Sequence, residues 1–204
     1  RIWDTAGGHL RYELQHDSSV TDIDFSPDGR FVYTSAGDRF TRQWDASTGE
    51  EIQAFSGGEK EIYGVALSPD GNTLAMGDQD GTITVWDTAS GSKLHTLAGH
   101  AGLVLRLAFN PDGSRLASTS FDRLAKVWDV AAGEEVSSLY GNQSNLFGVA
   151  FSPDGDQLVT AGADGTVRTY TMAMDELIAL AESRLTRTLT EEECRKFLHV
   201  ATCP

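Results

Sequence analysis

Short runs of alternating apolar and polar residues, separated by glycine-containing turns, recur along most of the chain. The segment VALSPDGNTLAMGDQDGTITVWD, residues 65–87, has apolar residues two apart on both sides of a Pro-Asp-Gly turn and a Trp-Asp pair at its end. The segment LAFNPDGSRLASTSFDRLAKVWD, residues 107–129, repeats this pattern. Alternation with a period of two predicts half-buried β-strands. Pro-Asp-Gly favours a tight turn, because proline fixes φ and glycine accepts a positive φ.

The pattern is present in four copies with a constant period of 42 residues. Its fixed points are the turns at Pro27, Pro69, Pro111 and Pro153, the aromatic residues Trp44, Trp86, Trp128 and Tyr170, and the aspartates Asp38, Asp80, Asp122 and Asp164. Each copy contains short strand-like runs, with the Pro-Asp-Gly turn after the first run and an aspartate-containing turn after the second. Four short antiparallel strands per period predict an all-β protein in which each copy forms one blade of a β-propeller.

The chain resembles the WD-repeat β-propeller family over residues 1 to about 171. Gly99-His100, Asp122 and Trp128-Asp129 stand where that family has its Gly-His, its loop aspartate and its Trp-Asp. The resemblance implies a hydrogen-bonded network within a blade, made of the His, a Ser or Thr of the second strand, the Asp and the Trp. The third copy would supply His100, Ser118 or Ser120, Asp122 and Trp128, and the first copy would supply His16, Thr34, Asp38 and Trp44.

The other two copies depart from this network. In the second copy, Gly58 stands at the histidine position and Met76 at the serine position, and in the fourth copy Asn142 and Tyr170 replace the His and the Trp. Each hydrogen bond of this kind contributes about 0.5–1.5 kcal/mol net. We therefore expect the second and fourth blades to be held more by packing than by the network.

The repeats are incomplete at both ends. Residues 1–4 match a third strand and residues 10–15 a fourth strand, whereas the last copy ends after its third strand. Proteins avoid unpaired strand edges, so we expect further propeller blades upstream. Two alternatives are a chain that closes with a second copy of itself, and a compact ring in which residues 10–15 complete the blade of residues 146–171.

Residues 172–204 have a different composition and no blade-type turns. Asp175 can cap a first helix, and Thr190 with Glu193 forms a capping-box pattern that opens a second one. We expect a two-helix tail packed on the propeller, the alternative being a loosely ordered tail. The segment is similar to the endings of bacterial WD-repeat proteins, which implies upstream signalling or effector domains, including switch domains of the STAND type.

Net charge and composition narrow the classes of partner. The chain has 204 residues and a formal net charge of −14, and such a surface repels nucleic-acid phosphates. No apolar run is long enough for a membrane span, no signal peptide is visible, and two cysteines are too few for a disulfide framework. We expect a cytoplasmic protein that binds neither nucleic acid nor membrane and needs no metal or other cofactor.

The chain has none of the usual motifs of an enzyme, neither a phosphate-binding glycine loop nor a metal-ligand cluster nor a nucleophile elbow. A Ser, a His and an Asp in one copy could form a hydrolase triad, but the recurrence of Asp at a fixed period favours a structural network. The leading hypothesis is therefore a non-catalytic module that binds a protein partner or upstream domains of the same polypeptide. The alternatives are a ligand-sensing, autoinhibitory domain of a STAND-type signalling or defence protein, and an enzyme with its site in the central channel.

The candidate contact residues are those least constrained by the repeat. They are Asp22 and Arg106 in the first strands, and Gln79 and Phe121 before the aspartate turns. Aromatic residues and arginine are frequent interface anchors. The alternative for Phe121 is packing on a neighbouring blade.

Overall fold

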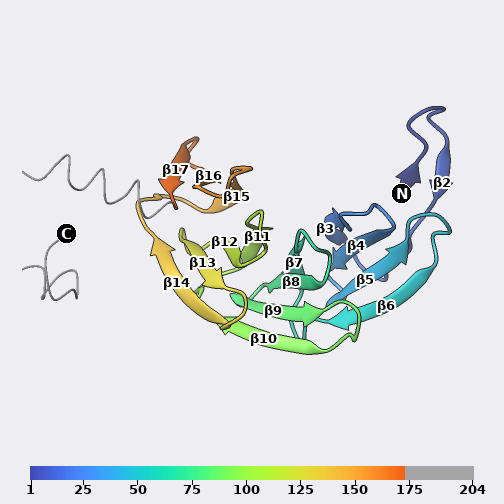
Figure 1. The fold of residues 1–204 in the computed structure, drawn as a ribbon, viewed down its shortest axis with the longest axis horizontal. Coiled ribbons are helices and arrows are strands. Elements are labelled where there is room, and N and C mark those ends of the chain that lie inside the picture. Colours follow the sequence, from blue (N-terminus) through green and yellow to red (C-terminus); the bar gives the residue numbers. More distant parts are fainter. Residues whose placement is uncertain (173–204) are drawn as a thin grey trace, which may run out of the picture. The chain divides into compact units, whose positions relative to one another are not determined.

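The computed structural model describes residues 1–172, and all regular elements in this range are β-strands (Figure 1). The chain divides into two compact units, Arg1–Tyr170 and Thr171–Pro204, and the description below concerns the first. The predicted all-β class and the antiparallel sheets are confirmed. The two helices predicted in the tail lie outside the described residues.

The strands form one short hairpin and four antiparallel sheets, and the strands of each sheet follow one another in sequence. The hairpin pairs β1 (Ile2–Trp3) with β2 (Leu10–Tyr12). The first sheet contains β3 (Val20–Phe25), β4 (Phe31–Ala36), β5 (Phe40–Asp45) and β6 (Glu51–Ser56). The second sheet contains β7 (Ile62–Leu67), β8 (Thr73–Asp78), β9 (Thr82–Asp87) and β10 (Lys93–Ala98).

The third sheet repeats this order, and the fourth has three strands among the described residues. The third contains β11 (Val104–Phe109), β12 (Arg115–Ser120), β13 (Ala125–Asp129) and β14 (Glu134–Leu139), and the fourth contains β15 (Leu146–Phe151), β16 (Gln157–Gly162) and β17 (Val167–Thr171). Within residues 1–172, the fourth sheet contains the three strands that the repeat predicts. β2 pairs with β1 and not with β17, so the compact ring closed by residues 10–15 is not formed.

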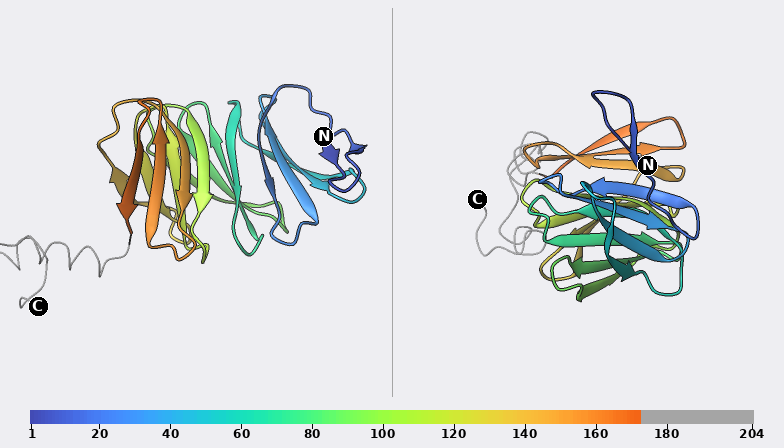
Figure 2. Two further views of the ribbon diagram at one scale, coloured as in Figure 1. Left: turned by 90° about the horizontal axis from the view of Figure 1, so that it is seen from above. Right: turned by 90° about the vertical axis from the view of Figure 1, so that its right-hand side faces the viewer.

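The Pro-Asp-Gly turns connect the first and second strands of each sheet. In the first sheet, the Ser26 hydroxyl donates to Asp28 Oδ1 at 2.6 Å, and Gly29 has a φ of 70°. Ser68 with Asp70 and Ser152 with Asp154 form the same contact in the second and fourth sheets. The aspartate turns lie at the other end of the strands, between the second and third strand of each sheet. Every sheet therefore has a Pro-Asp-Gly end and an aspartate-turn end (Figure 2).

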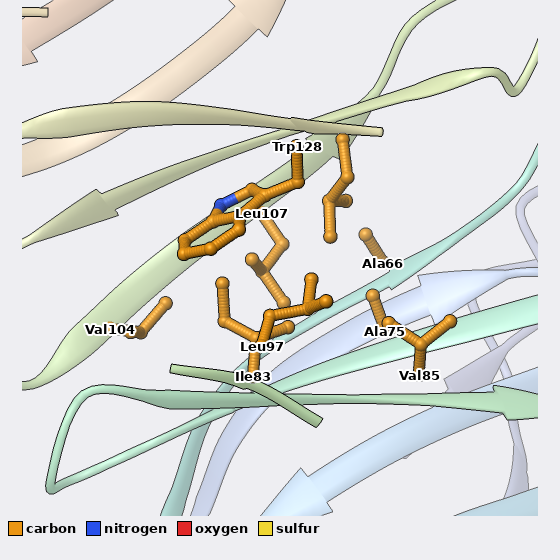
Figure 3. Packing of buried hydrophobic residues seen from close by; sticks show 9 residues of the cluster. Ala66, Ala75, Ile83, Val85, Leu97, Val104, Leu107 and Trp128 are labelled. Carbon is orange, nitrogen blue, oxygen red and sulfur yellow. The ribbon is translucent and has the colours of Figure 1, made fainter. Parts of the chain in front are cut away.

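Neighbouring sheets pack face to face, and their first strands β3, β7, β11 and β15 contact one another in sequence (Figure 1). The period of two sends Val65 and Leu67 of β7 towards the first sheet and Ala66 towards the third. The cluster between the first and second sheets contains Tyr33, Phe55, Ile62, Val65, Leu67, Leu74 and Met76. The cluster between the second and third contains Ala66, Ala75, Ile83, Val85, Leu97, Val104, Leu107, Leu116 and Trp128 (Figure 3).

Candidate interaction site

In the third sheet, the His, Ser, Trp and Asp side chains of the network lie within hydrogen-bonding distance of one another in sequence: Asp122 to His100, His100 to Ser118, and Ser118 to Trp128. His100 Nε2 lies 2.7 Å from Ser118 Oγ, and His100 Nδ1 lies 2.8 Å from Asp122 Oδ2. Trp128 Nε1 donates to Ser118 Oγ at 2.8 Å, and the Trp128 side chain is buried. A carboxylate only accepts hydrogen bonds, so His100 carries its proton on Nδ1, and Nε2 accepts from the Ser118 hydroxyl. Of the two serines considered from the sequence, Ser118 is therefore the one that contacts His100.

Ser120, the other serine considered for this network, has a different role. Its hydroxyl donates to Gly102 O at 2.9 Å and accepts from the backbone N–H of Asp122 at 3.0 Å. It therefore holds the aspartate turn to the loop that precedes β11, and it does not contact His100.

The order Ser118, His100, Asp122 matches the order of groups in a hydrolase triad. Ser118 is fully buried, however, and its oxygen already accepts the indole proton of Trp128. Burial would raise the pKa of Asp122, but hydrogen bonds from the backbone N–H groups of Ala101 and Leu124 outweigh it and lower that pKa. The ionised Asp122 carboxylate therefore stabilises its turn, and the burial of Ser118 keeps a substrate away from its hydroxyl.

The network of the first sheet differs from that of the third sheet at Asp38. Thr34 Oγ1 accepts from Trp44 Nε1 at 2.7 Å and lies 2.8 Å from His16 Nε2. Asp38 Oδ2 is 4.0 Å from His16 Nδ1, because the Arg42 guanidinium lies between them at 3.0 Å from His16 Nδ1 and 2.7 Å from Asp38 Oδ2. The four residues of the implied network are therefore connected, with Arg42 as the link between His16 and Asp38.

Arg42 also fixes the proton position on His16. A guanidinium only donates, so His16 Nδ1 accepts from Arg42 and the proton lies on Nε2, which donates to Thr34. The histidines of the first and third sheets thus hold opposite tautomers. Burial lowers the pKa of His16, and the positive charge of Arg42 lowers it further.

Acid is expected to destabilise the first sheet through His16. Its pKa in the folded protein lies below the unfolded value of 6.5, so its contribution to stability is complete above pH 6.5 and is lost as the pH falls below that value. Between pH 7.5 and 5.5 the wild-type chain should lose about 1 kcal/mol more of its unfolding free energy than His16→Asn. Urea denaturation at both pH values measures this difference, and equal losses in the two proteins would contradict it. Asparagine is the natural occupant of this repeat position in the fourth sheet.

The second and fourth sheets lack the complete network. Met76 replaces the serine, and Trp86 Nε1 is buried without a partner in the described part of the chain. In the fourth sheet Asn142 Nδ2 donates to the Tyr170 hydroxyl at 3.3 Å, whereas the buried Thr160 Oγ1 has no partner among residues 1–172. The unpaired atoms belong to residues that match the repeat, and the departures are at their expected partners: Met76 in the second sheet, and Asn142 and Tyr170 in the fourth.

The aspartate-turn end of the strands presents the predicted contact residues Gln79 and Phe121. Gln79 is exposed, and its backbone N–H donates to Glu61 O at 3.0 Å. Phe121 is 40% exposed and forms an edge-to-face pair with Phe147 of β15, which is 48% exposed, at a centroid separation of 5.9 Å. Phe121 thus both packs on the neighbouring sheet and offers an aromatic surface to solvent.

Sequence reasoning missed Phe147. It stands at the repeat position of Tyr63 and Leu105, next to the bulge that each first strand forms. A comparison of this repeat position across the copies would have found an apolar or aromatic residue in three of the four.

The first-strand candidates Asp22 and Arg106 face each other across the second sheet. Arg106 Nη1 lies 3.7 Å from Asp22 Oδ2. Gly64 stands at the same repeat position in the sheet between them, and a Cβ on Gly64 would lie 2.9 Å from Leu105 O. The absence of a side chain at Gly64 lets β11 approach β7 closely.

Two carboxylates of β3 accept hydrogen bonds from the backbone of β7. Asp22 Oδ2 accepts from Val65 N–H at 3.0 Å, and Asp24 Oδ2 accepts from Leu67 N–H at 2.9 Å. Burial raises the pKa of both carboxyl groups, although these hydrogen bonds oppose the shift. Asp22 is therefore tied to the second sheet as well as to Arg106.

Comparison with known proteins places the repeats. The WD domain, G-beta repeat model matches residues 8–45, 49–87, 91–129 and 133–171. The chain belongs to the WD40 repeat family. Its WD40 repeats mark it as a protein-interaction or scaffold module of a family that is typically non-catalytic.

A fungal protein shares part of these WD40 repeats. Over 63 residues the chain is 41% identical to nuclear distribution protein PAC1 of Coccidioides posadasii (strain C735). The match covers 30% of this chain and 13% of that protein. The similarity therefore concerns the repeats, and it assigns no whole-protein activity to this chain.

Two further properties concern residues 1–172 alone. No group of three or more His, Cys, Asp or Glu side chains in this range is placed to hold a metal ion. The same range contains no helix long and apolar enough to cross a membrane.

Proposed function

We propose that residues 1–172 form a non-catalytic module that binds a protein partner at the aspartate-turn end of the strands. The observation that carries this proposal is the exposed pair Phe121 and Phe147, with Arg106 and Gln79 on the same ends of the strands. Exposed aromatic residues and arginine on a rigid scaffold are the usual anchors of protein interfaces. The polar groups of the third-sheet network are buried and already bonded, so they stabilise this surface without forming part of it.

A change at Phe121 tests this surface. Phe121→Ala should weaken the complex of the full chain with its partner protein at least about tenfold, as expected for an aromatic anchor. The matched control is Leu94→Ala, which removes an exposed apolar side chain from β10. Affinity is measured by biolayer interferometry with a partner identified by crosslinking through a photoreactive residue at position 79. Equal affinities of the two variants, or a complex unaffected by both, would contradict the assignment.

We also propose that further blades cover the outer face of the first sheet. Ile23 is 56% exposed, whereas its counterparts Val65 and Leu107 are 5% and 7% exposed because a preceding sheet covers them. Phe25, two residues further along the same face, is also exposed, whereas its counterpart Leu67 is buried. The outer face of the first sheet carries apolar residues at the positions where the second and third sheets contact a preceding sheet. This face is therefore suited to contact with another WD40 blade, supplied by a longer polypeptide or by a second copy of this chain.

A narrower candidate is a ligand-sensing, autoinhibitory domain of a bacterial STAND-type protein in the cytoplasm. Its support is the similarity of residues 172–204 to the endings of bacterial WD-repeat proteins. The test is the coding sequence upstream of Arg1. A phosphate-binding glycine loop followed by more copies of the 42-residue repeat would favour the sensor, and further repeats alone would favour a scaffold.

A further inference from the structure

A cleft of about 480 Å³, lined by both apolar and polar residues, opens between the first and second sheets at their Pro-Asp-Gly end. Its walls come from the turns of both sheets and from strands β4, β5 and β6. The apolar part includes Phe31, Tyr33 and Ile52, and the polar part includes Gln43, Gln53 and Thr88. The cleft lies at the opposite end of the strands from Phe121.

Gln43 provides a free hydrogen-bond donor in this cleft. The residue is only 6% exposed and lines the cleft. Gln53 Nε2 donates to Gln43 Oε1 at 2.9 Å and to Thr88 O at 2.6 Å, which fixes the orientation of the Gln43 amide. Gln43 Nε2 has no partner among residues 1–172, so a ligand carbonyl could accept a hydrogen bond from it.

The mouth of the cleft is acidic. The carboxylates of Asp28 and Asp70 line it, and Asp45 and Asp87 lie in the neighbouring turns of the same two sheets. Hydrogen bonds within the turns lower the pKa of all four, so they are ionised at neutral pH. Arg30, which lies 5.3 Å from the Phe31 ring, is the basic residue of these turns. The two carboxylates that line the cleft, Asp28 and Asp70, favour a cationic ligand.

Two of the polar lining residues, Gln43 and Thr88, are particular to this pair of sheets. At the same repeat positions between the second and third sheets, Val85 replaces Gln43 and Val130 replaces Thr88, and both valines pack in the apolar cluster there. The WD40 fold therefore does not need polar groups at these positions. Their presence between the first two sheets requires a separate reason.

We propose that this cleft binds a lysine- or arginine-containing segment of a protein partner, as a second site separate from the Phe121 surface. The aliphatic stem of the basic side chain packs on Phe31 and Ile52, and its charged head lies between Asp28 and Asp70. The peptide carbonyl accepts a hydrogen bond from Gln43 Nε2. The occupant is thus recognised by charge at the mouth and by one hydrogen bond inside.

The test uses the full chain and a fluorescein-labelled Gly-Lys-Gly-Lys-Gly peptide, followed by fluorescence anisotropy at low salt. Asp70→Asn should weaken binding by up to about fivefold, as for a partly exposed ion pair. Gln43→Val, which places the second sheet's residue in the first, should weaken it about two- to tenfold. Asp112→Asn removes the same turn carboxylate from the third sheet, away from the cleft, and should leave the affinity unchanged. Thermal melting confirms that each variant is folded.

A second readout locates the peptide. The side-chain amide resonance of Gln43, assigned by its loss in Gln43→Val, should shift on addition of the lysine peptide. A resonance that does not move would overturn the proposal, as would equal effects of Asp70→Asn and Asp112→Asn or equal binding of a Gly-Glu-Gly-Glu-Gly peptide. Phe121→Ala should leave this binding intact, so failure here is distinct from failure of the proposed interaction surface.

Discussion

Thr34→Val is expected to lower the free energy of unfolding by about 2–4 kcal/mol, whereas Thr160→Val should be neutral or mildly stabilising. Both threonines are buried and occupy the same repeat position in the first and fourth sheets. Thr34 Oγ1 accepts from Trp44 and from His16, so its loss leaves two buried donors unpaired. Thr160 Oγ1 has no partner in residues 1–172, so replacing its hydroxyl with a methyl group removes a desolvation cost.

Equilibrium urea denaturation of the two variants and the wild type measures this difference. The substitution and the strand position are the same in both, so differences in β-propensity and volume largely cancel. A similar loss of stability in the two variants would show that the hydrogen bonds of Thr34 add little, and that packing alone holds the first sheet.

Gly81→Ala is expected to cost about 2–5 kcal/mol, and Gly165→Ala about 1–2 kcal/mol. Both glycines have a positive φ and occupy the same repeat position in an aspartate turn. Arg39 and Arg123 occupy that position in the other two sheets at φ values of 75° and 74°, so the backbone conformation alone tolerates a side chain. A Cβ on Gly81, however, would lie 2.4 Å from His100 O, whereas nothing lies within 4 Å of one on Gly165.

The shift in the urea midpoint of each variant tests this steric argument. The conformational cost is common to both glycines, so the excess at Gly81 reports the clash with the His100 carbonyl. If Gly165→Ala proved as costly as Gly81→Ala, the conformational preference of glycine would account for both values and the clash would be unimportant.

The sequence predicted the fold because its repeat is regular. The constant spacing of Pro27, Pro69, Pro111 and Pro153, together with the alternating apolar residues, located the sheets and the order of their strands. It also indicated that the last copy stops after its third strand. These features depend on local turn chemistry and on the period of two, both of which can be read directly from the sequence.

Most of the contacts that the sequence did not predict lie between copies. Within the first sheet, Arg42 lies between His16 and Asp38 and bonds to both, whereas His100 of the third-sheet network contacts Asp122 directly. The approach of Arg106 to Asp22 depends on Gly64 in the sheet between them. The Gln43 cleft exists because two sheets meet with polar residues where the next pair has valines. Such contacts can be recognised only when the sheets are placed side by side in the folded chain.

The two carboxylates of β3 have a consequence for how the chain avoids unwanted association. The carboxylates of Asp22 and Asp24 accept hydrogen bonds from the backbone N–H groups of Val65 and Leu67 in β7. Without these bonds, the two N–H groups would be free to pair with an extended peptide as an additional strand. The two carboxylates take the place of the backbone acceptors that a neighbouring strand would supply. A side chain has no second row of backbone groups, so no further strand can be added beyond it. On the next strand, β11, the corresponding neighbours are Gly64 and Ala66, which carry no acceptor. Its protection from strand addition must come instead from the close approach of the β7 backbone.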